Sequence, residues 1–296
     1  MKGHRPPTAA ELKRLFSERG IRANRGRGQN FLVDVRAMRF VAEAANLGPA
    51  DVVLEPGPGT GGLTGLLAER AGAVIAVELD RKLHALAREN LAGFPNVTVL
   101  HADIMARGGG IAPDALEAVE VALSGIAGGR LKVVSNLPYR VSTAFIAAMF
   151  RGERVPDDMV VTVQREVADR LLAEAGAKDY GYLSVVVQAL AEIRKLRKLP
   201  PGAFWPPPEV DSAVVRITPR RRRPDGETIQ ALERIVSALF THRRKKAAAG
   251  LVGAGTAKTR DEARALLEKV GASPDARPED LTVGQFIELA AAAHRP

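Results

Sequence analysis

The segment Ser135-Asn136-Leu137-Pro138-Tyr139 places an amide, free carbonyls and an aromatic ring directly after the apolar run 131–134. The apolar run predicts a buried strand, and ligands of open α/β sheets bind at the carboxyl ends of strands. Asn136 offers an acceptor and a donor, the proline-stiffened turn leaves the Leu137 carbonyl outside the ladder, and Tyr139 offers a π face. This set suits a nucleobase with an exocyclic amine. It also fits a purely structural role, in which the asparagine caps a helix and the tyrosine completes the core.

A second chemical signal is the glycine-rich turn at 55–62, which follows a predicted strand at 51–54. Gly57, Gly59 and Gly62 fit the spacing G-x-G-x-x-G. Glycine lets the backbone approach a ligand closely, and the N-terminus of the following helix adds partial positive charge. The turn therefore predicts a cofactor site, although the glycine spacing alone is weak evidence.

Three carboxylates decide between two cofactors. A dinucleotide is one interpretation, because Glu78 stands about 20 residues after the glycines, where such folds keep a ribose-binding carboxylate. Glu55 argues against it, since a carboxylate two residues before Gly57 repels a pyrophosphate and attracts a sulfonium or ammonium group. S-adenosylmethionine needs a carboxylate for its ribose, which Glu78 supplies, and an acceptor for its adenine amine, which Asp103 supplies. We therefore predict S-adenosylmethionine as the cofactor.

These residues require strands that end at a common edge. Alternating apolar runs and amphipathic helices predict a doubly wound α/β sheet with strands at 51–54, 73–77, 97–100, 131–134 and 159–163. Two further strands are expected at 183–191 and 210–217, with the rigid, proline-rich loop 200–208 between them. From residue 225 onward only helical patterns occur, at 229–240, 260–270 and 283–292. We expect a cofactor-binding domain at 1–219 and a small all-α domain at 220–296.

Composition limits the class of protein. The chain has 296 residues, 46% of them apolar, and no cysteine. Disulfides and thiolate metal sites are therefore excluded, a reducing compartment is favoured, and no metal is expected. No apolar run approaches the roughly 18 residues of a membrane span, and the first residues lack the apolar core of a signal peptide. We expect a soluble, cytoplasmic monomer without a membrane partner.

Basic residues are in excess and clustered. The formal charge is +9 and the pI about 10.1. Four clusters carry the excess: Arg22, Arg25 and Arg27; Arg194, Lys195, Arg197 and Lys198; Arg220–Arg223; and Arg243–Lys246. Such clusters neutralise phosphates and favour nucleic acid as a partner. The alternative is a solvated basic surface.

Several motifs, taken in order and spacing, resemble those of the ribosomal RNA adenine N6,N6-dimethyltransferases, and most closely the bacterial small-subunit (16S) enzymes. They are Gly28-Gln-Asn-Phe-Leu, Glu55-Pro-Gly-Pro-Gly-Thr-Gly-Gly-Leu-Thr, Val77-Glu-Leu-Asp, Asn136-Leu-Pro-Tyr, Val163-Gln-Arg-Glu-Val-Ala, Tyr180-Gly-Tyr-Leu-Ser and Phe204-Trp-Pro-Pro-Pro-Glu-Val-Asp-Ser. The resemblance covers residues 20–296. It implies a class I methyltransferase (Rossmann-like) sheet with an antiparallel last strand, followed by a helical domain that binds RNA.

The resemblance also implies roles for residues that bind S-adenosylmethionine. Asn30 and Leu32 would close over the cofactor. Gly57 would contact its methionine end, in the same turn as Glu55 and Gly59. The ribose hydroxyls would fall to Glu78, the adenine amine to Asp103, and Asn136 would bridge cofactor and target.

For the target base, the resemblance implies that Tyr139 and Phe204 sandwich the adenine. Asn136 and the Leu137 carbonyl would accept hydrogen bonds from its N6 amine while a methyl group is transferred twice. The implied function is dimethylation of two adjacent loop adenines in small-subunit ribosomal RNA during ribosome maturation. A non-catalytic ribosome-assembly or RNA-binding protein and a DNA adenine methyltransferase remain as alternatives.

Overall fold

The computed structural model describes residues 4–23 and 28–293. The chain forms two compact units: the first comprises Met1–Ala168 and Arg194–Thr218, the second Asp169–Ile193 and Pro219–Pro296. The sequence predicts one boundary after residue 219. The second unit also takes in Asp169–Ile193, because the helix in that segment packs against two helices of the C-terminal part.

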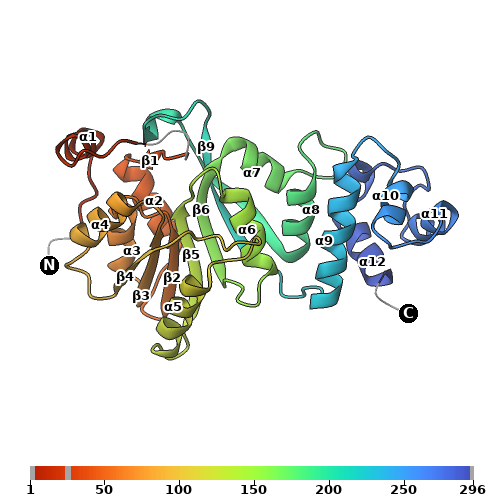
Figure 1. The fold of residues 1–296 in the computed structure, drawn as a ribbon, viewed down its shortest axis with the longest axis horizontal. Coiled ribbons are helices and arrows are strands. Elements are labelled where there is room, and N and C mark those ends of the chain that lie inside the picture. The colour runs from red at the N-terminus through yellow and green to blue at the C-terminus, as the bar shows by residue number, and fades with distance from the viewer. Residues whose placement is uncertain (1–3, 24–27, 294–296) are drawn as a thin grey trace. The chain divides into compact units, whose positions relative to one another are not determined.

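A seven-stranded sheet forms the centre of the first unit (Figure 1). Its order is β4 (Val97–His101), β3 (Ala73–Glu78), β2 (Asp51–Pro56), β5 (Arg130–Asn136), β6 (Asp158–Gln164), β9 (Ser212–Pro219) and β7 (Ala191–Leu199). The neighbours from β4 to β6 are parallel and β9 runs antiparallel to β6. The predicted doubly wound sheet with an antiparallel last strand is therefore confirmed. The strand order reverses at β2, and such a switch point opens a crevice at the carboxyl ends of the strands.

Helices cover both faces of this sheet (Figure 1). Right-handed crossovers place the helices after β2 and β3 on one face, and the reversal of strand order sends those after β4 and β5 to the other. The helices of this unit are α1 (Ala9–Glu18), α2 (Val35–Ala44), α3 (Gly62–Ala68), α4 (Arg81–Asn90), α5 (Pro113–Ser124) and α6 (Ser142–Arg151), and α7 (Arg165–Leu172) begins in it. Because both faces are covered, the central strands are largely apolar, and β2 is buried along its whole length.

The first unit also contains a small two-stranded sheet. The strand β1 (Phe31–Leu32) pairs antiparallel with β8 (Phe204–Trp205), which follows a 3₁₀ turn at Pro201–Ala203. Asp34 caps α2 by accepting hydrogen bonds from the backbone N–H groups of Arg36 and Ala37. The proline-rich loop therefore brings Phe204 beside the segment that leads into α2.

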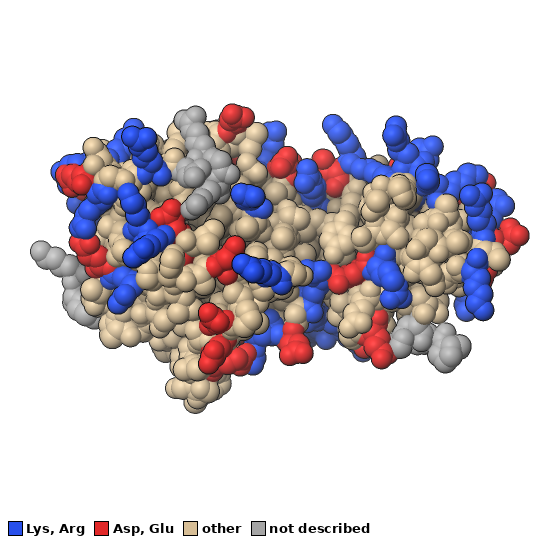
Figure 2. Space-filling view, in the orientation of Figure 1, with Lys and Arg blue, Asp and Glu red and all other residues tan. Residues whose placement is uncertain are grey.

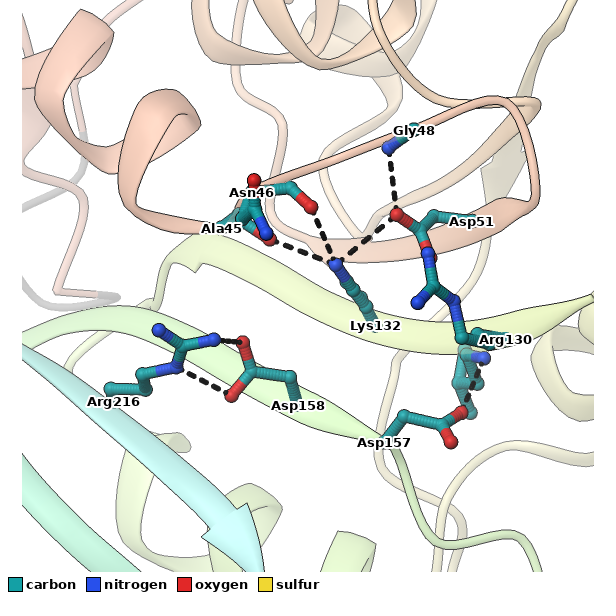
Figure 3. Close-up of polar contacts among 10 residues, drawn as sticks. Ala45, Asn46, Gly48, Asp51, Arg130, Lys132, Asp157, Asp158 and Arg216 are labelled. Carbon is teal, nitrogen blue, oxygen red and sulfur yellow. Dashed lines mark hydrogen bonds and ion pairs between the residues drawn. The ribbon is translucent and has the colours of Figure 1, made fainter.

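An ionic cluster lies at the amino-terminal ends of β2 and β5 (Figure 3). Lys132 of β5 is 8% exposed at its side chain, and its Nζ donates to the carbonyls of Ala45 (3.0 Å) and Asn46 (2.8 Å) and lies 3.1 Å from Asp51 Oδ2. Asp51 is fully buried and also accepts from the backbone N–H of Gly48 at 2.7 Å. This cluster connects the end of α2 to β2 and β5 at the edge opposite the carboxyl ends.

The second unit is helical apart from the start of β7. Its helices are α8 (Tyr182–Leu190), α9 (Gly226–Thr241), α10 (Ala247–Gly253), α11 (Arg260–Lys269) and α12 (Val283–Ala292), with a 3₁₀ turn at Pro278–Asp280. Tyr180 anchors the interior: its ring packs edge-on to Phe240, which also contacts Phe286, and its hydroxyl donates to the Leu281 carbonyl at 2.9 Å. The three predicted helices are confirmed, whereas α10 was not predicted.

The strand predicted at 183–191 is wrong. The segment forms α8, and β7 follows it. Its β-branched residues favour a strand, but Val185, Val186 and Val187 are all fully buried, so α8 is apolar around its circumference and packs against α9 and α12. Tertiary burial therefore overrides the local propensity.

The strand β7 was not predicted because it carries the basic cluster 194–198. It lies at the end of the strand order, where exposed Lys and Arg protect an open edge from pairing with another chain. Arg197 lies over the Phe40 ring at 5.0 Å, and Lys198 pairs with Asp211 at 2.8 Å. No helix in the described part of the chain is both long and apolar enough to cross a bilayer.

Candidate active site

The carboxyl ends of β2, β3, β4 and β5 surround a cavity of about 470 Å³. Small-ligand pockets usually measure about 300–1,000 Å³. Six of the predicted site residues line it: Asn30, Gly57, Gly59, Glu78, Asp103 and Asn136. The sheet thus brings together residues that are more than 100 positions apart in the chain.

A smaller hollow of about 40 Å³ adjoins this cavity and shares Gly57, Gly59 and Asn136 with it. Leu32 and Glu55 line the hollow. Both were predicted to bind the cofactor, and both lie at the edge of the cavity rather than in its wall.

The glycine turn needs its glycines for close approach. Gly57 and Gly59 have φ values of +69° and +59°, in the left-handed region. A Cβ on Gly57 would lie 2.8 Å from Cγ of Pro138, and one on Gly59 would lie 3.0 Å from the Phe31 ring. The turn is therefore packed between the β5 turn and the segment before α2, which leaves no room for a side chain.

Glu78 is 6% exposed and held by two backbone N–H groups. Its Oε2 accepts from Gly59 at 3.1 Å and its Oε1 from Asp80 at 2.9 Å. Burial raises the pKa of this carboxyl, and the two backbone hydrogen bonds oppose part of the rise. Each oxygen keeps a lone pair, so the fixed carboxylate can accept from a pair of hydroxyl groups.

Glu55 is the most strongly perturbed acid of the site. The carboxyl is 1% exposed, and its burial, helped by the nearby Glu78, raises the pKa to about 8. The adjacent Thr64 hydroxyl opposes part of this shift, yet neither it nor Oε2 of Glu55 completes a hydrogen bond with any described residue. A buried carboxyl with one unpartnered oxygen beside a small hollow fits an ammonium or sulfonium group.

Asp103 has a different environment. It is exposed, and its Oδ1 accepts from the backbone N–H of Met105 at 3.0 Å. Ile104 lines the same wall and is 6% exposed. An acceptor beside an apolar side chain suits an aminopurine ring, whose edge needs a partner and whose face needs an apolar contact.

Asn136 ends β5 with its acceptor free. Its Nδ2 donates to the Asn30 carbonyl at 2.9 Å, which can only accept, so the amide orientation is fixed. Oδ1 is buried and has no partner among the residues described. A buried acceptor without a partner costs about 1–3 kcal/mol, so its persistence points to a donor supplied by a ligand.

The next residue, Leu137, is 1% exposed and donates its backbone N–H to the Thr162 carbonyl at 3.2 Å. No described residue donates to the Leu137 carbonyl. Two acceptors therefore follow one another at the end of β5. Such a pair can bind both hydrogens of an exocyclic amine.

Tyr139 and Phe204 lie together but do not form an open sandwich. Their ring centroids are 6.4 Å apart and the rings meet edge to face at 66°. Phe204 is 3% exposed, and the Tyr139 hydroxyl shares a 2.7 Å hydrogen bond with Ser212 Oγ, while burial raises the tyrosine pKa. Stacking an adenine between them requires one ring to turn, because the two rings contact each other directly.

Several lining residues were given no role by the sequence, among them Phe31, Ile104 and Arg140. Each is the immediate neighbour of a residue that was singled out. That adjacency was the available signal, because both faces of a turn can reach a cavity at a strand end. Arg25 and Arg27 of the first basic cluster lie outside the described residues.

Comparison with known proteins identifies the group to which this chain is similar. A family model for the ribosomal RNA adenine dimethylases matches residues 20–293. The ribosomal RNA small subunit methyltransferase A of Moorella thermoacetica is 40% identical over 93% of this chain and 94% of its own length. The protein of the same name from Phenylobacterium zucineum is 38% identical over 96% of this chain and 92% of its own length.

Solved structures show the same fold. The 23S rRNA methyltransferase ErmE matches with a TM-score of 0.63 and 28% identity, over 90% of this chain and all of that one. A dimethyladenosine transferase from Plasmodium falciparum matches with a TM-score of 0.68 and 21% identity, over 88% of this chain and 95% of that one. The match of the family model across both units, together with these relatives, shows that the chain belongs to the ribosomal RNA adenine dimethylase family.

Proposed function

We propose that this chain is the S-adenosylmethionine-dependent enzyme that dimethylates N6 of two adjacent loop adenines in small-subunit ribosomal RNA during maturation of the subunit. The observation that carries the proposal is the unpartnered, buried Oδ1 of Asn136, next to the free Leu137 carbonyl. A binding protein without catalysis has no need for such a pair. Membership of the adenine dimethylase family supplies the reaction class.

The residues present fit the cofactor. Glu78 would hold the ribose hydroxyls, Asp103 the adenine amine and the glycine turn the methionine end, with Glu55 facing its positive charge. Three acids in different environments support this assignment. Glu78 is buried and held by two backbone N–H groups, Asp103 is exposed, and Glu55 is buried with one unpartnered oxygen. When bound, the cofactor supplies an electrophilic methyl group on a sulfonium.

The chain's contribution to the reaction is alignment and polarisation. The N6 lone pair of adenine is delocalised into the ring and is a poor nucleophile. By accepting the N6 hydrogens, Asn136 Oδ1 and the Leu137 carbonyl would localise that lone pair and stabilise the positive charge that develops on nitrogen. The proton can leave to water afterwards, so no general base is required, and orientation contributes the rest.

Tyr139 and Phe204 would hold the target base by its faces once one ring has turned. An adenine in a duplex cannot reach the site without leaving its stack, so an unpaired loop adenine is the preferred substrate. We further propose that the protein acts as a monomer on the small-subunit RNA.

Mass mapping of methylated adenosines tests the proposal. Small-subunit ribosomal RNA and, as a matched control, large-subunit RNA would each be incubated with the protein and the cofactor. We expect N6,N6-dimethyladenosine at two adjacent positions of the small-subunit RNA. Binding without methyl incorporation would favour a non-catalytic assembly factor. Methylation of an adenine-containing DNA, incubated in parallel, in place of RNA would favour a DNA adenine methyltransferase.

A further inference from the structure

A second hollow lies in the helical unit, between α9 and α10. It measures about 260 Å³, and most of its wall is apolar and small: Ala238, Leu239, Ala249, Gly250, Gly253 and Pro278. Thr241, His242, Lys245 and Lys246 complete it. All of these residues belong to the second unit, so the hollow is separate from the cavity at the sheet.

Two glycines of α10 have different reasons to be glycine. A Cβ on Gly250 would lie 2.7 Å from Cδ1 of Leu239 and 3.2 Å from its Cα, so Gly250 allows α10 to pack closely on α9. A Cβ on Gly253, at the end of α10, would meet no heavy atom within 4 Å. Packing therefore explains Gly250, whereas Gly253 is exposed at the wall of the hollow and has space for a side chain.

The cations around the hollow are not equivalent. Arg243 is used within the fold: its guanidinium donates to the carbonyls of Lys178 (2.8 Å) and Ala177 (3.3 Å). Lys246 pairs with Asp275 at 2.8 Å. Arg244 and Lys245 are exposed and make no ion pair within the described part of the chain. Two unneutralised cations thus stand at or beside an apolar hollow.

This combination matches an unstacked nucleotide. Small apolar walls give a base an apolar contact, and adjacent cations accept the phosphates on either side, as the basic grooves of single-strand-binding proteins do. Figure 2 shows several Lys and Arg side chains along the upper edge of the helical unit, above α10 and towards α11. An acidic peptide would use the cations and leave the small-residue walls without a function.

We propose that the hollow between α9 and α10 receives a single unstacked base of the RNA substrate, with Arg244 and Lys245 on its flanking phosphates. The inference rests on the proposed RNA substrate and assigns a base-binding site to the second unit. This site is distinct from the one that receives the target adenine.

Filling the hollow is the direct test. Gly253→Leu places a side chain at the wall of the hollow. The midpoint of thermal unfolding of this variant should not fall below that of the unchanged protein, which shows that the variant is folded. Gly226→Leu is the matched control, because Gly226 begins α9 in the same unit, its Cβ would also meet nothing within 4 Å, and it does not line the hollow.

The readout is the dissociation constant for small-subunit ribosomal RNA at several salt concentrations. We expect Gly253→Leu to raise it about tenfold, the effect of losing one base contact, with an unchanged salt slope because no phosphate contact is lost. Gly226→Leu should bind as the unchanged chain does. Equal affinity of Gly253→Leu and the unchanged chain, or a loss that comes with a smaller salt slope, would overturn the base site.

A second measurement identifies the occupant. The chain has no cysteine, so Gly253→Cys provides a unique attachment point for a photo-crosslinker. We expect crosslinks to one unpaired nucleotide; crosslinks spread over duplex RNA, or none in the bound complex, would refute the proposal. Neither measurement needs methyl transfer, so a catalytically inactive protein would contradict the proposed function alone.

Discussion

Asn136 makes one hydrogen bond to the chain and leaves one buried acceptor for a ligand. Because the Asn30 carbonyl fixes the amide orientation, the acceptor is in place before any substrate binds. Preorganised groups of this kind act in the transition state without reorganisation. In the proposed function this residue therefore acts in the chemical step more than in cofactor binding.

We expect Asn136→Ala to lower turnover by roughly two to three orders of magnitude, the usual effect of losing one preorganised hydrogen-bonding group. The dissociation constant for S-adenosylmethionine should change far less, since Glu78 and Asp103 remain. Single-turnover methylation and calorimetric titration measure the two effects separately. Turnover close to that of the unchanged enzyme would remove the polarising role.

Glu55 should make cofactor binding depend on pH. With its pKa raised to about 8, the carboxyl is mostly protonated at pH 7 in the free protein. The positive methionine end favours the ionised form, so binding releases a proton, and affinity should rise between about pH 6 and pH 8. Glu55→Gln should flatten this dependence. Calorimetry in two buffers of different ionisation enthalpy counts the proton, and an unchanged pH profile in the variant would exclude Glu55 as its source.

The same carboxyl affects stability. Its folded pKa of about 8 lies above the ordinary value of 4.5, so the folded chain binds more protons than the unfolded chain between these values. Its contribution is present below about pH 4.5 and is lost as pH rises through 8. Glu55→Gln should therefore lose less thermal stability than the unchanged protein between pH 5 and pH 8. Glu78, whose pKa is also raised, should retain part of the dependence in both.

At the level of elements, the strand ends serve opposite purposes. The carboxyl ends hold unpartnered polar atoms, whereas the amino ends hold polar groups that are largely satisfied. Lys132 binds two carbonyls at the end of α2 and Asp51 at the start of β2 (Figure 3). This separation allows the sheet to keep its stability at one edge and its reactive groups at the other.

We expect Lys132→Met to lower the free energy of unfolding of the first unit by about 3 kcal/mol, because it leaves Asp51 and two carbonyls without their buried partner. Denaturant unfolding measures the loss. Cofactor affinity, measured where the variant is folded, should stay the same, since the cluster lies at the opposite strand ends. Lys13→Met on the exposed face of α1 is the control and should change stability by less than 0.5 kcal/mol, as is usual at the surface. Equal effects of the two changes would contradict the role of the cluster.

At the scale of the whole molecule, the proposed function assigns cofactor binding to the first unit and an RNA contact to the second. The basic run 243–246 was predicted to contact RNA as one cluster. Arg243 and Lys246 instead make contacts within the second unit, and only Arg244 and Lys245 make no ion pair with the described residues. The charge available to RNA is therefore smaller than the sequence suggests.

We expect the double change Arg244→Gln and Lys245→Gln to weaken RNA binding and reduce its salt slope by about two, close to one unit for each phosphate contact. The change of Lys13 and Arg14 to Gln removes the same charge from α1 and serves as the matched control. Cofactor affinity should stay constant in both. If the two variants lose slope equally, net charge explains the effect, and the α9–α10 connection has no special part.

The sequence by itself determined the parallel strands β2 to β6 and the edge of the sheet at which their polar residues gather. Apolar runs that end in Glu78, Asp103 or Asn136 are local patterns, and right-handed crossovers bring consecutive strand ends to one edge, so few other arrangements were available. The need for glycine at 57 and 59 was also predictable, because the tight turn after β2 requires positive φ values, which glycine adopts without strain.

Tertiary structure alone decided the rest. The valines of α8 form a helix because the surrounding structure, including α9 and α12, buries them. Local propensity favours a strand here and carries no information about these neighbours. The pKa of Glu55, the free acceptor of Asn136 and the contact between Tyr139 and Phe204 each depend on residues distant in the chain. Burial and hydrogen-bond partners are properties of the packed chain, and a sequence pattern fixes them only where both partners are local.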